Sequence, residues 1–558
     1  MGSGATFAPR SWPRFPAPSR IYRAILPKSY GGRIALETLS GLVAYHARIA
    51  GTGPMIWIDT GGPVYQRWLK MFRHHYGAVN VSQPMALWAL VNRLKQQGLV
   101  QGYVLYSKTG KHVADDKANN TPGDASVNIA TSLCAPLEAI ALDQRMVPEA
   151  KKLGLHELVD AHGKSFDWLL NQIRGRFSRR VLGLLSPAQT NLRDEFVAAD
   201  ALVTEYRKGG GYQRSLKFMN NGGIVLGWDG HEYHVTDAAS RFGLRVVAAD
   251  WASDIPLLSS GATGLHAPKG LSVRPHKALP IHSNPEKHYV AFISSDGDNL
   301  CYAMGGAFFN SQHFWNDPIR GKIPFGWSLP MEDLLQVCPY ELKYLRTSAK
   351  PTDGLVQFGS GYFYWDHFGA ARGGADALDP VLRRASLFLN RLGLHTMISF
   401  TVSWNSPQAL AAYRRAAVNI PNLRALFTIQ FDPYAAGRGK IIWIRRENGP
   451  PLPVLSAKAA IWNMPKNIYA GSPGHVARLL NRWAAKPVRN MGNRFTWVVV
   501  HAWSRFADPG SPGVKLGVYD AAAYCAAHLS SSIKVVTPEQ LAKLLGQTKA
   551  LAGPEVVK

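Results

Sequence analysis

Apolar residues along the chain follow two patterns, a helical spacing of three to four positions and short continuous runs. Helical spacing extends over 34–50 and 85–97, and apolar runs follow at 54–59 and 102–107. The first pattern is typical of helices with one buried face, and the second is typical of buried strands. The first hundred residues therefore predict a small α/β layer domain.

Polar stretches rich in Gly, Pro, Asn or His divide the sequence into parts. The clearest are 108–124 and the connector at 261–285. Two apolar runs before that connector, 223–229 and 244–250, each end at an Asp, as strands of open α/β sheets do. The predicted parts are a flexible arm at 1–20, an α/β domain at 21–115, a second domain at 116–188, a third α/β domain at 189–275 and a C-terminal domain at 285–550.

The C-terminal part repeats a strand–helix unit. Its apolar runs are 289–294, 354–358, 396–402, 426–431, 459–462, 496–500 and 533–536. Four helical patterns between or after them begin with a capping residue and a Pro, at Asp379, Ser406, Ser472 and Thr537. Such units, about seven or eight in all, predict a parallel sheet covered by helices and closed into a TIM-like (βα) barrel. An open doubly wound sheet is the alternative.

Composition restricts the partners. The formal net charge is +26, but no long basic run, zinc finger or RNA-binding aromatic motif is present, so we expect no nucleic-acid binding. Diffuse positive charge fits a protein that acts on an acidic polymer or at an anionic cell surface, or it is a solubility trait of the source organism. No apolar run is long enough for a transmembrane segment. The four cysteines are far apart in the sequence, so a structural zinc site is not expected and no disulfide is assigned.

In a barrel of this kind the active site lies at the carboxyl ends of the strands. One strand is followed by Asp296-Gly297-Asp298-Asn299 and another by Asp432, so we predict Asp296, Asp298 and Asp432 as catalytic carboxylates. Residues near the same strand ends are predicted to bind substrate: Asn299, Trp327, Gly359, Gly361, Tyr362, Tyr364, Trp404, Trp462, His501 and Trp503.

These residues also have structural interpretations. The acidic segment is typical of a tight turn, as is Asp432 before Pro433. His501 in an apolar run is typical of a core histidine. Asp298 and Asn299 carry oxygen atoms of the kind that bind Ca²⁺ or Mg²⁺, but the spacing of a calcium loop is missing. We predict no metal site and no cofactor, with a Ca²⁺ or Mg²⁺ ion near Asp298 as the alternative.

The segment Gly359-Ser360-Gly361-Tyr362-Phe363-Tyr364 resembles the motif of the GxGYxYP family of putative glycoside hydrolases, with Trp365 in place of the final Pro. The segment 294–299 resembles an acidic motif of the same family, and 34–42, 126–131, 192–194 and 226–228 resemble its N-terminal domains. The resemblance extends from about Tyr22 to Leu545. It implies three small N-terminal domains, a barrel-like catalytic domain and a carbohydrate substrate.

Four functions are consistent with these features. A glycoside hydrolase would cleave a bacterial or plant polysaccharide with the aspartates as acid and as base or nucleophile. The positive charge, with Tyr362 or Tyr364 and His501, also fits a polysaccharide lyase that acts on an anionic uronate polymer. A metal-dependent polysaccharide deacetylase and a non-catalytic glycan-binding protein are the remaining alternatives. We expect a secreted or periplasmic protein whose leader has been removed; the oligomeric state stays open.

Overall fold

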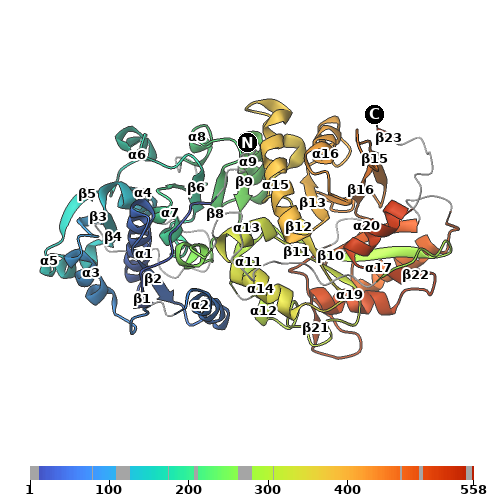
Figure 1. Cartoon of the computed structure of the whole chain (residues 1–558), viewed down its shortest axis with the longest axis horizontal. Coiled ribbons are helices and arrows are strands. Elements are labelled where there is room, and N and C mark those ends of the chain that lie inside the picture. Colours follow the sequence, from blue (N-terminus) through green and yellow to red (C-terminus); the bar gives the residue numbers. More distant parts are fainter. Residues whose placement is uncertain are drawn as a thin grey trace, which may run out of the picture.

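The computed structural model describes residues 12–77, 80–107, 126–173, 175–206, 211–261, 280–305, 307–464, 468–488, 494–547 and 556–557. Small sheets formed by the first 260 residues lie at one end of the molecule, and a large sheet that begins at residue 288 lies at the other (Figure 1). No helix in these ranges is long and apolar enough to cross a membrane. All four cysteines are buried and free.

A long buried helix organises the N-terminal units. Helix α1 (Tyr30–Ala50) begins where the Ser29 hydroxyl accepts a hydrogen bond from the Gly32 amide, and it ends at Gly51 in the left-handed conformation. The helix packs against elements of all three units, so its residues are buried on more than one side. The other helices of these units are α2 (Pro63–Tyr76), α3 (Leu87–Gln96), α4 (Ser126–Leu137), α5 (Val147–Lys152), α6 (Phe166–Ile173), α7 (Arg193–Ala198), α8 (Tyr212–Leu216), α9 (Glu232–Arg241) and α10 (Ile255–Ser259).

Three parallel sheets belong to this part of the chain. Their strand orders are β1-β2, β4-β3-β5 and β7-β6-β8-β9. The strands are β1 (Arg20–Ile25), β2 (Pro54–Asp59), β3 (Gly102–Ser107), β4 (Ala139–Asp143), β5 (His156–Asp160), β6 (Val181–Leu185), β7 (Leu202–Thr204), β8 (Ile224–Trp228) and β9 (Arg245–Val247).

The sheets correct two predicted domain boundaries. Strand β3 pairs with the second sheet rather than the first, and β6 pairs with the third sheet rather than the second. The boundaries predicted at 115 and 188 therefore assign one strand each to the wrong sheet. The predicted arm at 1–20 is packed where it is described, because Trp12 is only 3% exposed and its indole N–H donates to Asp333 at 2.7 Å.

The C-terminal sheet has twelve strands in the order β18-β17-β19-β10-β11-β12-β13-β14-β16-β15-β23, and β22 pairs with the first half of β10. Its strands are β10 (His288–Ser294), β11 (Phe325–Leu329), β12 (Asp353–Phe358), β13 (Thr396–Thr401), β14 (Ala425–Gln430), β15 (Ile441–Ile444), β16 (Leu452–Ser456), β17 (Ala459–Ile461), β18 (Ala470–Gly471), β19 (Phe495–Val500), β22 (Ile533–Val535) and β23 (Val556–Val557). The pairs are parallel except for β15 with β16. A separate antiparallel pair joins β20 (Phe506–Ala507) and β21 (Lys515–Leu516).

The sheet is curled but open. The order from β17 through β19 and β10 to β16 is that of an eight-stranded barrel, yet no ladder joins β16 to β17 in the described residues. The mixed α/β multidomain architecture is confirmed, and the closed TIM-like barrel is not.

Helices cover the large sheet: α11 (Leu300–Met304), α12 (Ala307–Asn310), α13 (Met331–Val337), α14 (Pro339–Ser348), α15 (Asp379–Leu392), α16 (Pro407–Asn419), α17 (Pro473–Ala484), α19 (Val518–Ala527) and α20 (Pro538–Gln547). Three of the four predicted caps are confirmed, since Ser406, Ser472 and Thr537 accept hydrogen bonds from the amides of Ala409, His475 and Gln540. The prediction is wrong for Asp379, which lies inside α15 and pairs with Arg415.

Candidate functional site

Backbone hydrogen bonds join two segments of the large sheet to the third N-terminal unit. Tyr362, in the glycine–tyrosine segment, exchanges hydrogen bonds with Val246 of β9 at 2.7 and 2.9 Å. The amide of Leu300, directly after the acidic segment, donates to the Ala248 carbonyl at 2.8 Å. Strand β9 and the residues after it therefore lie beside both segments that the sequence marks as functional.

A buried ion pair fixes the glycine–tyrosine segment. The Arg245 guanidinium donates to both carboxylate oxygens of Asp333, at 2.9 and 3.0 Å, and to the Ser360 carbonyl at 2.8 Å. Gly361 has a φ of +109°, and a Cβ added there would lie 3.2 Å from the Cβ of Arg245. A glycine is required at this position because the backbone packs closely against Arg245 in a conformation that other residues avoid.

The acidic segment turns sharply after β10. Asp296 has a φ of +59°, which is uncommon outside glycine and often marks functional sites. A Cβ on Gly297 would lie 2.7 Å from the carbonyl carbon of Ser328, so the turn also needs a glycine. The Asn299 side chain caps α11 by accepting a hydrogen bond from the Tyr302 amide at 2.8 Å. The turn interpretation is thus correct for the backbone, and the turn directs Asp296 and Asp298 into a pocket.

This pocket, of about 950 Å³, lies between the acidic segment and the third N-terminal unit, and Thr60, Gly62 and Tyr65 of the first unit also line it. Its carboxyl groups belong to Glu232, Asp250, Asp296, Asp298 and Asp432. Its aromatic residues are Tyr65, Trp228, Trp251, Tyr302, Tyr362, Phe431, Tyr434, Trp462, His501 and Trp503. Within the described part of the chain, no Lys or Arg lines it.

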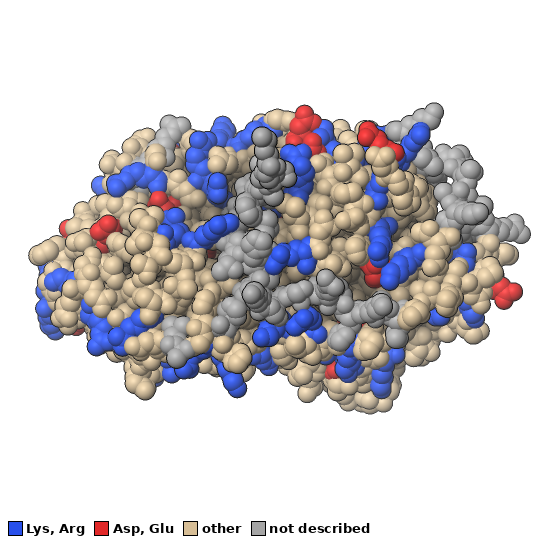
Figure 2. All heavy atoms as spheres, in the orientation of Figure 1, with Lys and Arg blue, Asp and Glu red and all other residues tan. Residues whose placement is uncertain are grey.

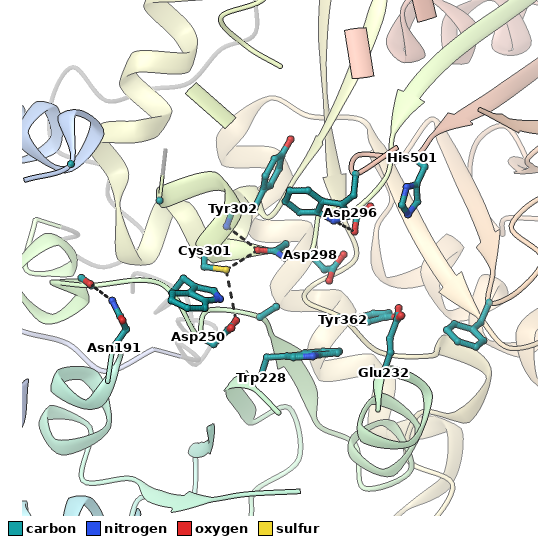
Figure 3. A pocket seen from close by; sticks show the side chains of 18 of the residues that line it. Asn191, Trp228, Glu232, Asp250, Asp296, Asp298, Cys301, Tyr302, Tyr362 and His501 are labelled. Atoms are coloured by element: carbon teal, nitrogen blue, oxygen red, sulfur yellow. Dashed lines mark hydrogen bonds between the residues drawn. The ribbon is translucent and has the colours of Figure 1, made fainter. Parts of the chain in front are cut away.

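Three carboxyl groups face one part of the pocket from two units (Figure 3). Burial, and then the charge of Asp296, raise the pKa of Asp298 well above its ordinary value. Burial also raises the pKa of Glu232, while the Tyr362 hydroxyl, which donates to Glu232 Oε1 at 2.5 Å, opposes that shift. The Asp296 carboxylate accepts hydrogen bonds from the Trp503 indole N–H, at 2.8 Å, and from the Ser295 hydroxyl.

Flat aromatic faces flank these carboxyl groups. Tyr434, Trp462 and His501 form a stack with ring centroids 5.0 and 5.1 Å apart. Tyr362 stacks on Trp228 with an angle of 10° between the rings. Burial lowers the pKa of His501, which favours the neutral imidazole. Apolar faces beside carboxyl groups suit a ligand that is flat on its faces and polar at its edges.

Another part of the pocket surrounds Asp250, which follows β9. Its Oδ1 accepts a hydrogen bond from the Cys301 thiol at 3.8 Å, and the same thiol lies 3.1 Å from Asn299 Oδ1. Trp251 is 60% exposed beside it. In Figure 3, Asp250 and Cys301 lie to one side of the group formed by Asp296, Asp298 and Glu232. The pocket therefore extends well beyond the three converging carboxyl groups.

The pocket contains eight of the predicted site residues: Asp296, Asp298, Asn299, Tyr362, Asp432, Trp462, His501 and Trp503. The other five do not line it. Trp327 is buried, stacks on Tyr519 and donates its indole N–H to Asp353, whereas Tyr364 is buried among aromatic residues behind Tyr362. Trp404 is also buried, and Gly359 and Gly361 shape the loop.

Sequence reasoning missed the contribution of the third N-terminal unit. Trp228 and Asp250 lie at or just after strands β8 and β9, and Glu232 opens helix α9 after β8. The signal was present, since the apolar runs at 223–229 and 244–250 each end at an Asp. Reading strand ends in this unit as well as in the C-terminal part would have found these residues.

Among the described residues, no group of three or more His, Cys, Asp or Glu side chains is arranged to hold a metal ion. The oxygen atoms of Asp298 and Asn299 lie in the pocket, but Asn299 Oδ1 already accepts hydrogen bonds. The prediction of no metal site, and its alternative of a Ca²⁺ or Mg²⁺ ion near Asp298, both stay untested.

Comparison with known proteins identifies the chain's relatives. Residues 286–546 match the C-terminal domain of the GxGYxYP putative glycoside hydrolases, and 100–177 and 181–260 match the family's second and third domains. The chain belongs to the GxGYxYP family. No curated protein matches the sequence.

The family fold also appears in a crystal structure of a putative hydrolase from Bacteroides thetaiotaomicron VPI-5482. The two chains share 22% sequence identity, with a TM-score of 0.76 over 96% of each chain. At this identity the likeness concerns the fold alone, which extends over the N-terminal units as well as the large sheet.

Proposed function

We propose that this protein hydrolyses glycosidic bonds in the pocket between its large sheet and its third N-terminal unit. The observation that carries the proposal is the unequal environment of two carboxyl groups on one turn. Burial raises the pKa of Asp298 well above its ordinary value, whereas two donors hold the carboxylate of Asp296. Glycoside hydrolysis needs such a division, with one carboxyl group protonated and another ionised.

In this proposal Asp298 is the general acid. Its proton passes to the glycosidic oxygen as the bond to the leaving sugar breaks. Asp296 either attacks the anomeric carbon or removes a proton from the attacking water, and one water is added to the products in total. The indole N–H of Trp503 orients the Asp296 carboxylate for this role.

Two further carboxyl groups are candidates for the base or nucleophile. Asp432, at the end of β14, lines the same pocket. Glu232 comes from the other unit and is held by Tyr362, so it faces the acidic segment across the pocket. During cleavage the glycosidic bond lies between the two catalytic carboxyl groups of the enzyme. Glu232 is therefore a better placed alternative to Asp296 than Asp432 is.

The lyase alternative has less support. A lyase acting on uronates needs a cation to neutralise the substrate carboxylate, and no Lys or Arg from the described residues lines the pocket. Burial and the charge of Glu232 raise the pKa of Tyr362, which makes this tyrosine a poorer base. No observation specifically favours the deacetylase.

The test is a polysaccharide panel analysed by product mass. Hydrolysis predicts fragments that carry one added water and no ultraviolet-absorbing unsaturated sugar. Asp298→Asn and Asp296→Asn should each lower the rate by roughly 10²–10⁴-fold. Unsaturated products would establish the lyase instead. Binding without any product across a panel that contains a bound glycan would indicate a glycan-binding protein.

A further inference from the structure

We propose that the pocket selects glycans by charge: it takes an amino sugar, whose protonated amine pairs with Asp250 while its ring lies on Trp251, and it excludes acidic sugars. The inference rests on the proposed function for the class of ligand, a glycan. It goes further by naming the chemistry of the sugar and a residue that recognises it.

The first argument is the contrast between pocket and surface. The chain has a net charge of +26, and Lys and Arg are spread over the face in Figure 2. The pocket instead carries five carboxyl groups, and no cationic side chain of the described residues lines it. Hydrolysis uses two carboxyl groups, so the remaining ones are available to contact a bound glycan. An acidic sugar would lie against several carboxyl groups and would find no cation among these side chains.

The second argument is the position of Asp250. The carboxylate lines the pocket and accepts hydrogen bonds from the Cys301 thiol and from its own backbone amide, and among the described residues no cationic side chain pairs with it. Burial raises the pKa of Asp250, and an ammonium group nearby would favour the ionised form. A ligand that donates charged N–H groups is the natural partner of such a carboxylate.

The third argument is Trp251. Exposed apolar surface gathered in a groove often marks a ligand site, and this indole, 60% exposed, lines the pocket together with its other aromatic side chains. A sugar ring stacked on the indole would place its substituents near Asp250, the preceding residue. An ammonium group there gains attraction from the aromatic face as well as from the carboxylate.

The experiment measures binding to the full chain carrying Asp298→Asn, which prevents turnover. Oligomers of glucosamine, glucose and galacturonic acid of equal length are titrated by calorimetry at a pH where the amine is protonated. The glucosamine series should bind at least ~10-fold tighter than the glucose series, and the galacturonate series weakest. Adding Asp250→Asn should remove the preference for the amine while affinity for glucose oligomers stays within about twofold. Glu286→Gln, an exposed carboxylate outside the pocket, is the control and should change none of these affinities.

Equal affinity for the three series, no binding of the amino series, or an amine preference that survives Asp250→Asn would each overturn the proposal. Failure of hydrolysis is distinguished separately with the wild-type chain. A charge preference in binding without any cleaved product removes the hydrolase and keeps the amino-sugar subsite. Cleavage of all three series at equal rates keeps the hydrolase and removes the amino-sugar subsite.

Discussion

The buried ion pair Arg245–Asp333 joins the third N-terminal unit to the large sheet, and the free-energy cost of breaking it can be estimated. Both side chains are 0% exposed, and Arg245 also donates to the Ser360 carbonyl. Arg245→Met leaves the Asp333 carboxylate buried without its guanidinium partner, with the Trp12 indole N–H still donating to it. Removing one partner of a buried pair costs about 3–5 kcal/mol, because the remaining charge loses its compensation.

A double-mutant cycle separates the interaction energy of the pair from the other effects of each substitution. Asp333→Leu alone should cost a similar amount, whereas Arg245→Met with Asp333→Leu should cost only about 1–3 kcal/mol, mainly from the unpaired Ser360 carbonyl. The free energies come from urea unfolding followed by tryptophan fluorescence. Arg415→Met breaks a partly exposed pair with Asp379 and should cost at most ~1 kcal/mol. Single-mutant costs that simply add in the double mutant would refute the assignment of this pair as the junction.

Three further predictions concern other parts of the chain. Burial beside Glu37 raises the pKa of Asp194 to about 7, so the folded state holds a proton that the unfolded chain releases at lower pH. The melting temperature should therefore fall as pH rises from about 4 to about 7, and it should fall less steeply in Asp194→Asn. An equally steep fall in Asp194→Asn would contradict this assignment. Trp503→Phe removes the hydrogen bond to Asp296 and should lower kcat/KM on a cleaved glycan by about 10-fold without changing the melting temperature, whereas full activity would show that this bond does not matter. Gly361→Ala should lower the free energy of unfolding in urea by ~1–3 kcal/mol, whereas Gly546→Ala, whose added Cβ meets open space, should not lower it. Equal effects would count against the close packing of Gly361 on Arg245.

The strands and many helix starts of the large sheet could be predicted from sequence because their signals are local. Apolar runs found β13, β14 and β19 to within a residue or so, and Ser406 and Ser472 cap their helices as predicted. Closure of the barrel could not be predicted, since it depends on whether the edges β16 and β17 pair with each other. Edge pairing is a property of the whole sheet rather than of either strand's sequence.

The candidate site also contains some residues that the sequence could predict and others that it could not. Asp296 and Asp298 follow a buried strand, and strand ends are where function gathers, so sequence was enough to find them. Trp327 was predicted to bind substrate but does not line the pocket, because the sequence alone does not show whether an aromatic side chain packs inside the sheet or faces the pocket. The strand ends before Glu232 and Asp250 are visible in the sequence, but their place in this pocket is not, because it depends on contacts between units. Val246 of β9 pairs with Tyr362, and Ala248 after it contacts residues 299–300, more than fifty residues away.

The assignment of Asp298 as the general acid is tested most directly by comparing two substrates of one sugar in the wild type and Asp298→Asn. One substrate carries a natural sugar leaving group, which needs protonation, and the other carries a nitrophenolate, which leaves without it. We predict that Asp298→Asn lowers kcat/KM by roughly 10²–10⁴-fold on the natural glycoside and by far less on the nitrophenyl glycoside. Equal losses on both substrates, or full activity on the natural glycoside, would contradict the assignment.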